Sequence, residues 1–120
     1  MTATILDGRE LSKAMRAEMA QAAADFKARW NTVPGLAVVR AGEDPASVSY
    51  ARQIAKAFEA AGMAFQLHTL PDSASQQEIV ALVAQLSADP AVHGIMVQEP
   101  LPKGVDGVAV VAALSVAKDV

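Results

Sequence analysis

The sequence predicts an α/β domain of three layers (αβα), in which helices cover both faces of a mainly parallel sheet. Segments with apolar residues at helical spacing alternate with short apolar runs along the 120 residues, which is typical of strands joined by helices. The run from Leu36 to Val39 is continuously apolar, as expected of a central strand buried on both faces. Connections between parallel strands are right-handed, so successive helices pack back onto the sheet.

The first helix is expected over residues 6–30. Asp7 stands three residues before Glu10, an arrangement that resembles a capping box. Apolar residues then follow at helical spacing, namely Leu11, Met15, Met19, Ala22, Phe26 and Trp30. The pattern predicts an amphipathic helix of several turns.

A second helix is expected from Pro45 to about Ala61. Asp44 is a suitable N-cap residue, and proline is favoured at the first helical position. Gly62 stands where a left-handed residue commonly ends a helix. The alternating segment 63–70 then predicts a strand near the edge of the sheet.

The last part of the chain repeats the alternation. Ser75 and Glu78 form a capping box before a third helix, whose apolar stripe is Ile79, Leu82, Val83 and Leu86. A short strand is expected over residues 92–98, then an irregular segment with two prolines, then a last helix within residues 105–120 that its valines and Gly107 weaken.

The composition of the chain limits the classes of function that it can have. The chain is 52% hydrophobic and 19% charged, so we expect a single folded domain. Its net charge is −3 and it has no cysteine, which argues against nucleic acid as a partner and excludes disulfides and thiolate chemistry. No apolar run is long enough for a membrane span, and we expect a cytoplasmic protein that is not bound to a membrane.

Familiar catalytic patterns are missing from the sequence. The two histidines, His68 and His93, are isolated, and no acidic cluster has metal-ligand spacing, so no metal site is predicted. Ser47 and Ser49 lack a nearby histidine and are interpreted as first-turn helix residues. The chain contains neither a dinucleotide-binding glycine fingerprint nor a phosphate-binding loop, and no cofactor is predicted for it.

One rim of the predicted sheet gathers polar and rigid residues. In parallel sheets, ligands bind beyond the carboxyl ends of the strands. Tyr50 follows the first strand, and Gln98 follows the third together with Pro100, Leu101 and Pro102. A hydroxyl, an amide and a rigid apolar wall suit a polar heterocycle, but a single tyrosine and a single glutamine near a loop are more often ordinary surface residues.

Three segments carry a resemblance to a known family. The segments "GLAVVRAGEDPASVSY", "GIMVQEPLPKGVD" and the terminal "KDV" occur in order, after an opening "ILDGRELS". Together they resemble the N-terminal catalytic domain of the bifunctional methylenetetrahydrofolate dehydrogenase/methenyltetrahydrofolate cyclohydrolase family, the FolD type. The resemblance covers the whole chain, 1–120. It implies a tetrahydrofolate derivative as ligand, within one-carbon metabolism.

The resemblance also implies roles for individual residues. In the family, folate lies between the catalytic domain and a Rossmann domain that binds NADP or NAD, and no Rossmann domain is present in this chain. Tyr50 matches the substrate-site tyrosine, and Gln98 matches the glutamine that assists a catalytic lysine. The lysine position is occupied by Ile54, and Glu99 replaces a leucine.

Ile54 is the decisive difference, because an isoleucine neither donates nor accepts a proton. Lys56 is two positions further along the helix and is expected to point elsewhere. We therefore expect cyclohydrolase activity to be lost. Hydride transfer depends less on the lysine, so a longer enzyme of this kind retains dehydrogenase chemistry, whereas the 120-residue chain alone is predicted to be inactive.

Other interpretations stay open at the level of sequence. The chain is a catalytic domain from a longer or split enzyme, a non-catalytic folate-binding or regulatory module, or an α/β interaction domain. A homodimer or a Rossmann-domain partner is compatible with its high apolar content.

Overall fold

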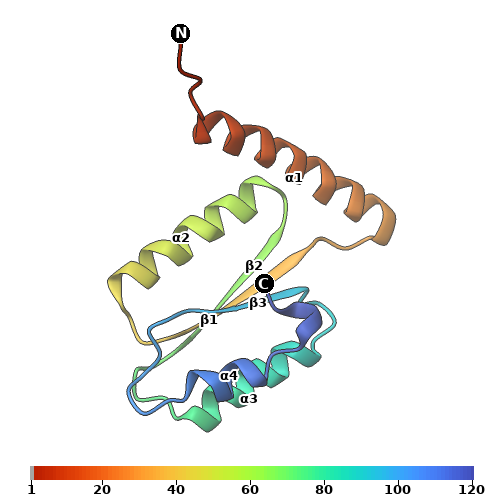
Figure 1. Cartoon of the computed structure of the whole chain (residues 1–120). Coiled ribbons are helices and arrows are strands. Elements are labelled where there is room, and N and C mark those ends of the chain that lie inside the picture. The colour runs from red at the N-terminus through yellow and green to blue at the C-terminus, as the bar shows by residue number, and fades with distance from the viewer. Residues whose placement is uncertain (1) are drawn as a thin grey trace.

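A computed structural model describes residues 2–120 and confirms the predicted α/β alternation (Figure 1). The elements, in chain order, are α1 (Gly8–Trp30), β1 (Gly35–Ala41), α2 (Pro45–Ala60), β2 (Ala64–Leu70), α3 (Gln76–Ala88), β3 (Gly94–Val97), α4 (Gly107–Ala112) and a 3-10 turn (Val116–Lys118). Within the described residues, no helix is both long enough and apolar enough to cross a bilayer.

The sheet has three parallel strands in the order β2-β1-β3, so the predicted central strand is indeed central. Val38 of β1 lies opposite Leu67 of β2 and Met96 of β3. Figure 1 shows α2 on one face of the sheet and α3 with α4 on the other. The three-layer arrangement is therefore confirmed, and the carboxyl ends of all three strands meet at one edge.

The main core lies between the sheet and α3. Val39 and Ile95 of the sheet and Ile79 of α3 are completely buried, and each such side chain contributes about 1.5–3 kcal/mol relative to an exposed one. The stripe that predicted α3 thus supplies the core. Lys118 closes the far end of α3, where its Nζ donates to the carbonyl oxygen of Asp89 at 2.6 Å.

Local signals at the helix ends act as the sequence predicts. Ser75 and Glu78 form both hydrogen bonds of the capping box. Asp44 caps α2 by accepting from the backbone N–H of Ser47 at 3.0 Å. Gly62 has a φ of 72° after the end of α2, a conformation that glycine adopts at little cost.

The third strand and the last helix are shorter than the sequence suggests. β3 ends at Val97, and Gln98 follows it, although the Gln98 backbone N–H still donates to the Val39 carbonyl at 2.8 Å. The last helix stops at Ala112. Its valines and initial glycine are poor helix formers, which accounts for its length of 6 residues.

The first helix forms, but its apolar stripe stays largely exposed. Leu11 is 62% exposed and Trp30 is 58% exposed, whereas Ala23 is the one buried residue of α1. Contact with the body includes an edge-to-face pair between Phe26 and His93, with ring centroids 5.9 Å apart. The helical spacing therefore predicted the helix correctly, whereas most of its apolar stripe is not covered by other residues within 2–120.

Candidate functional site

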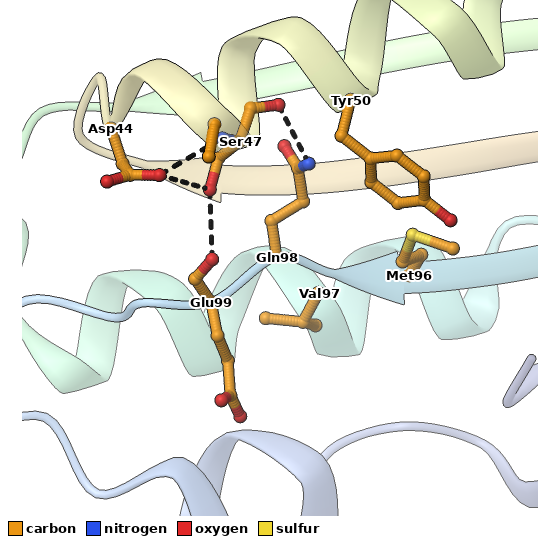
Figure 2. Close-up of a pocket in the computed structure, with 8 residues that line it drawn as sticks. Asp44, Ser47, Tyr50, Met96, Val97, Gln98 and Glu99 are labelled. Atoms are coloured by element: carbon orange, nitrogen blue, oxygen red, sulfur yellow. Dashed lines mark hydrogen bonds between the residues drawn. The ribbon is translucent and has the colours of Figure 1, made fainter.

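Tyr50 and Gln98 line the same hollow at the carboxyl edge of the sheet, as the topology predicted. The hollow has a volume of about 420 Å³. One wall comes from the start of α2 and the other from the end of β3 (Figure 2). Its lining residues are Asp44, Ala46, Ser47, Tyr50, Met96, Val97, Gln98 and Glu99.

Gln98 is one of two buried polar side chains in the lining of the hollow. It is 6% exposed, and its Nε2 donates to the backbone carbonyl of Ser47 at 3.0 Å. Because a carbonyl only accepts, this contact fixes which amide atom is the nitrogen. The other atom, Oε1, is buried without a hydrogen-bond partner among the described residues. An unsatisfied buried acceptor costs about 1–3 kcal/mol.

Ser47 joins the two walls, a role that the sequence did not reveal. It is 6% exposed, and its Oγ lies 2.9 Å from the carbonyl oxygen of Glu99 and 3.2 Å from Asp44 Oδ2. The hydroxyl has one proton and donates to one of these acceptors at a time. Its interpretation as an ordinary first-turn residue was incomplete, and the N-cap residue Asp44, three positions earlier, was the only local signal for it.

Tyr50 forms the open end of the hollow. The side chain is 52% exposed, and Figure 2 shows its ring on the same side of the hollow as Met96, with the hydroxyl directed away from the Gln98 amide. The two polar groups therefore line one hollow without contacting each other: the Tyr50 side chain is exposed, whereas the Gln98 amide is buried.

Ile54 lies one helical turn beyond Tyr50 and is half-buried. Residues four apart on a helix are offset by about 40°, so Ile54 shares the Tyr50 side of α2. It is not part of the hollow's lining. The interpretation of Ile54 as a packed core residue is therefore only partly met. Lys56 is exposed.

Pro100, Leu101 and Pro102 lie apart from the Tyr50–Gln98 hollow. They line a neighbouring hollow of about 390 Å³ with the Gly42 turn and Asp72. The Glu99–Pro100 peptide bond is cis, and Leu101 also packs against the core below the sheet. The Glu99 side chain is exposed and extends toward α4, away from Gln98 (Figure 2).

Both histidines have local structural partners. Nδ1 of His93 accepts from the backbone N–H of Gly35 at 3.0 Å. Nε2 of His68 lies 3.0 Å from Gln66 Oε1. Among residues 2–120, no group of three or more acidic or histidine side chains is placed to hold a metal ion.

Comparisons with known proteins agree on one family. Residues 6–120 match the family model described as the catalytic domain of tetrahydrofolate dehydrogenase/cyclohydrolase. The bifunctional protein FolD of Rhodopseudomonas palustris strain HaA2 is 52% identical over 120 residues, and that of Nitrobacter hamburgensis is also 52% identical. The chain is covered completely in both matches, yet it spans 41% of the length of these relatives.

Solved structures give the same result for the fold. The bifunctional FolD enzyme of Campylobacter jejuni aligns with a TM-score of 0.92 and 34% identity over 97% of this chain and 41% of that one. The Trypanosoma brucei enzyme, solved with NADP and an inhibitor, aligns with a TM-score of 0.91 and 32% identity over 99% of this chain and 41% of that one.

Proposed function

Since the chain belongs to the tetrahydrofolate dehydrogenase/cyclohydrolase family as a catalytic domain, we propose that the hollow between α2 and β3 binds a reduced folate. Support comes from the hollow's shape and lining: about 420 Å³, with one buried amide and one exposed tyrosine at its two ends. An apolar concave surface with few fixed polar groups suits a flat heterocycle.

The proposed site has lost its proton-transfer group. Hydrolysis of a methenyl bridge requires water to attack the bridging carbon, with a protein group to move protons. The half-buried Ile54 stands where the family's lysine is expected and has no transferable proton. Cyclohydrolase activity is therefore absent, while the side chains that orient the folate remain.

The observation that carries this proposal is the orphaned acceptor of Gln98. Its Oε1 is buried and has no hydrogen-bond partner among the described residues, although buried polar groups are nearly always paired. The family resemblance implies that this glutamine assists a lysine. An acceptor without a donor fits a pair of which only one member is left, and the side chain of Gln98 contacts α2, the helix that also carries Ile54.

A double-mutant cycle between positions 54 and 98 tests this explanation. Ile54→Lys introduces a donor, and its free energy of unfolding is compared with those of Gln98→Met and of the double variant. We expect the lysine to be tolerated better by about 1.5–3 kcal/mol when Gln98 is present, the range for hydrogen bonds to charged groups. Ala57→Lys, at an exposed position of the same helix, is the control. Equal coupling for both lysines would reject the pairing.

Folate binding is tested separately by calorimetric titration with tetrahydrofolate. The native chain is expected to bind, and Gln98→Ala and Tyr50→Phe are expected to weaken binding. Gln66→Ala, which removes an exposed amide of β2, should leave it unchanged. If the native chain did not bind tetrahydrofolate, the proposal that the hollow binds a reduced folate would be rejected.

Dehydrogenase chemistry belongs to a larger assembly in this account. The isolated chain is inactive, and a nicotinamide cofactor, NADP or NAD, is supplied by a Rossmann domain that acts together with this one. The catalytic domain holds and orients the folate, and the cofactor carries the hydride. The Trypanosoma brucei relative was solved with NADP. We place the activity in the cytoplasm, because a chain without cysteine suits a reducing compartment.

A second candidate is a non-catalytic folate-binding or assembly module. The exposed stripe of α1 favours it, because Leu11, Met15 and Trp30 are each about half exposed or more, and such patches mark association surfaces. A homodimer or a Rossmann-domain partner would cover the stripe. Sedimentation of the native chain and of Met15→Glu tests this candidate. Self-association of the native chain that is lost in Met15→Glu would support it. A native chain that stays monomeric at all concentrations would exclude the homodimer.

A further inference from the structure

A second hollow, of about 490 Å³, lies on the opposite side of α2 from the Tyr50–Gln98 hollow. Four of its residues recur at helical spacing on one face of α2, and two come from β1 and the turn after it. Around the helix axis, these four positions are separated by about 100–160° from Ser47 and Tyr50. The lining residues are Arg40, Glu43, Pro45, Val48, Ser49 and Arg52.

Arg40 is the unusual member of this group. It is 9% exposed and stands on the face of β1 shared by Leu36 and Val38, which are apolar and buried. Its Nε donates to the carbonyl oxygen of Gly42 at 3.1 Å. In residues 2–120 this is the only hydrogen bond of its guanidinium, and no carboxylate pairs with it. The other guanidinium nitrogens are not among the fully buried atoms that lack a partner, so their N–H donors stay accessible at the hollow that Arg40 lines and are available to a ligand.

Arg52 and Ser49 complete a polar cluster around Arg40. They are three positions apart on α2, so their side chains are neighbours on the helix surface, and both are exposed. A second guanidinium and a hydroxyl therefore converge on the hollow that contains Arg40. Guanidinium groups bind carboxylates and phosphates through paired N–H donors.

Glu43 is the one acidic residue of the lining. Its side chain is exposed and forms no ion pair with either arginine in the part of the chain that the structure describes. The hollow thus contains two cations and one anion, in a chain whose net charge is −3. A bound oxyanion would be attracted by the arginines and repelled by Glu43, so these residues should change its affinity in opposite directions.

We propose that Arg40, Arg52 and Ser49 form a binding site for an oxyanion, a carboxylate or a phosphate group of a small molecule. The site is separate from the hollow proposed for folate and does not depend on that proposal. Arg40 supplies the buried anchoring charge, while Arg52 and Ser49 contact the ligand from the solvent side. Pro45 and Val48 provide an apolar border.

Calorimetric and NMR titrations test the site, with inorganic phosphate and glutarate added in separate experiments at constant ionic strength. Both Arg52 and Glu43 are exposed, so their variants should fold. Arg52→Gln is expected to weaken anion binding about tenfold, in line with the loss of a charge-assisted hydrogen bond. Glu43→Gln should strengthen it. Arg16→Gln removes an exposed charge from α1 and should have no effect.

The outcomes separate the alternatives. Binding of phosphate alone, or of glutarate alone, supports the site and identifies the anion that it prefers. Equal weakening in Arg52→Gln and Arg16→Gln would overturn the proposal, since it would indicate general charge attraction. Failure of either anion to bind, or no gain in Glu43→Gln, would also overturn it. Gln98→Ala should bind the anion normally, whether or not it still binds folate.

Discussion

The two walls of the Tyr50–Gln98 hollow differ in how firmly their side chains are held. On the β3 wall, Gln98 is 6% exposed and fixed through its backbone and its side-chain amide. On the α2 wall, Tyr50 is 52% exposed and Ile54 is half-buried. The β3 wall thus holds its polar side chain firmly, whereas the α2 helix carries Ile54, which has no transferable proton, at the position where the family resemblance implies a lysine. Under the proposed function, folate binding and hydrolysis depend on different walls.

The largest effect is expected at Ser47, which holds the two walls together. Ser47→Ala removes the hydroxyl of a 6% exposed side chain, which lies 2.9 Å from the Glu99 carbonyl oxygen and 3.2 Å from the Asp44 carboxylate. Unfolding by urea should show a loss of about 1–3 kcal/mol in the free energy of unfolding. The control is Ser49→Ala, on the exposed side of the same helix, for which a change within about 0.5 kcal/mol is expected. Equal effects would mean that Ser47 does not join the walls.

A smaller effect of opposite sign is expected at Gln98. Gln98→Met keeps an unbranched side chain of similar size and removes the orphaned Oε1, while the Ser47 carbonyl keeps its place in the helical hydrogen-bond pattern of α2. We expect stability to rise by about 1 kcal/mol and folate binding to weaken. A marked loss of stability in urea would show that Gln98 serves the fold more than the site.

The smallest effect on stability is expected at Tyr50. Tyr50→Phe removes a hydroxyl from a side chain that is 52% exposed, so the free energy of unfolding should change by less than about 0.5 kcal/mol. Thermal stabilisation by tetrahydrofolate should nevertheless decrease. If the variant retained the full ligand-dependent shift in Tm, the α2 wall would contribute shape alone.

The sequence predicts the parts of this molecule that local chemistry determines. The capping box of Ser75 and Glu78, and the Asp44–Pro45 start of α2, involve hydrogen bonds between residues a few positions apart. Parallel topology then brings Tyr50 and Gln98 to one edge without any knowledge of their contacts. These predictions need no long-range packing information.

Contacts between residues far apart in the sequence could not be predicted from the sequence. The Ser47 hydroxyl meets the carbonyl of Glu99, 52 positions later, and neither residue type indicates such a contact. Residues 100–102 line a neighbouring hollow, because the chain leaves the Tyr50–Gln98 hollow after Glu99. The buried Arg40 interrupts an apolar strand, and only its packing under α2 distinguishes it from a surface charge at the end of a strand.

The most direct test of the central claim is the rate at which the native 120-residue chain hydrolyses 5,10-methenyltetrahydrofolate, followed by the loss of methenyl absorbance. With Ile54 at the lysine position, the rate is expected to equal that of buffer alone, even at folate concentrations that saturate binding. A rate above buffer that Gln98→Ala abolishes would contradict the account, because it would show that this hollow catalyses hydrolysis without the lysine.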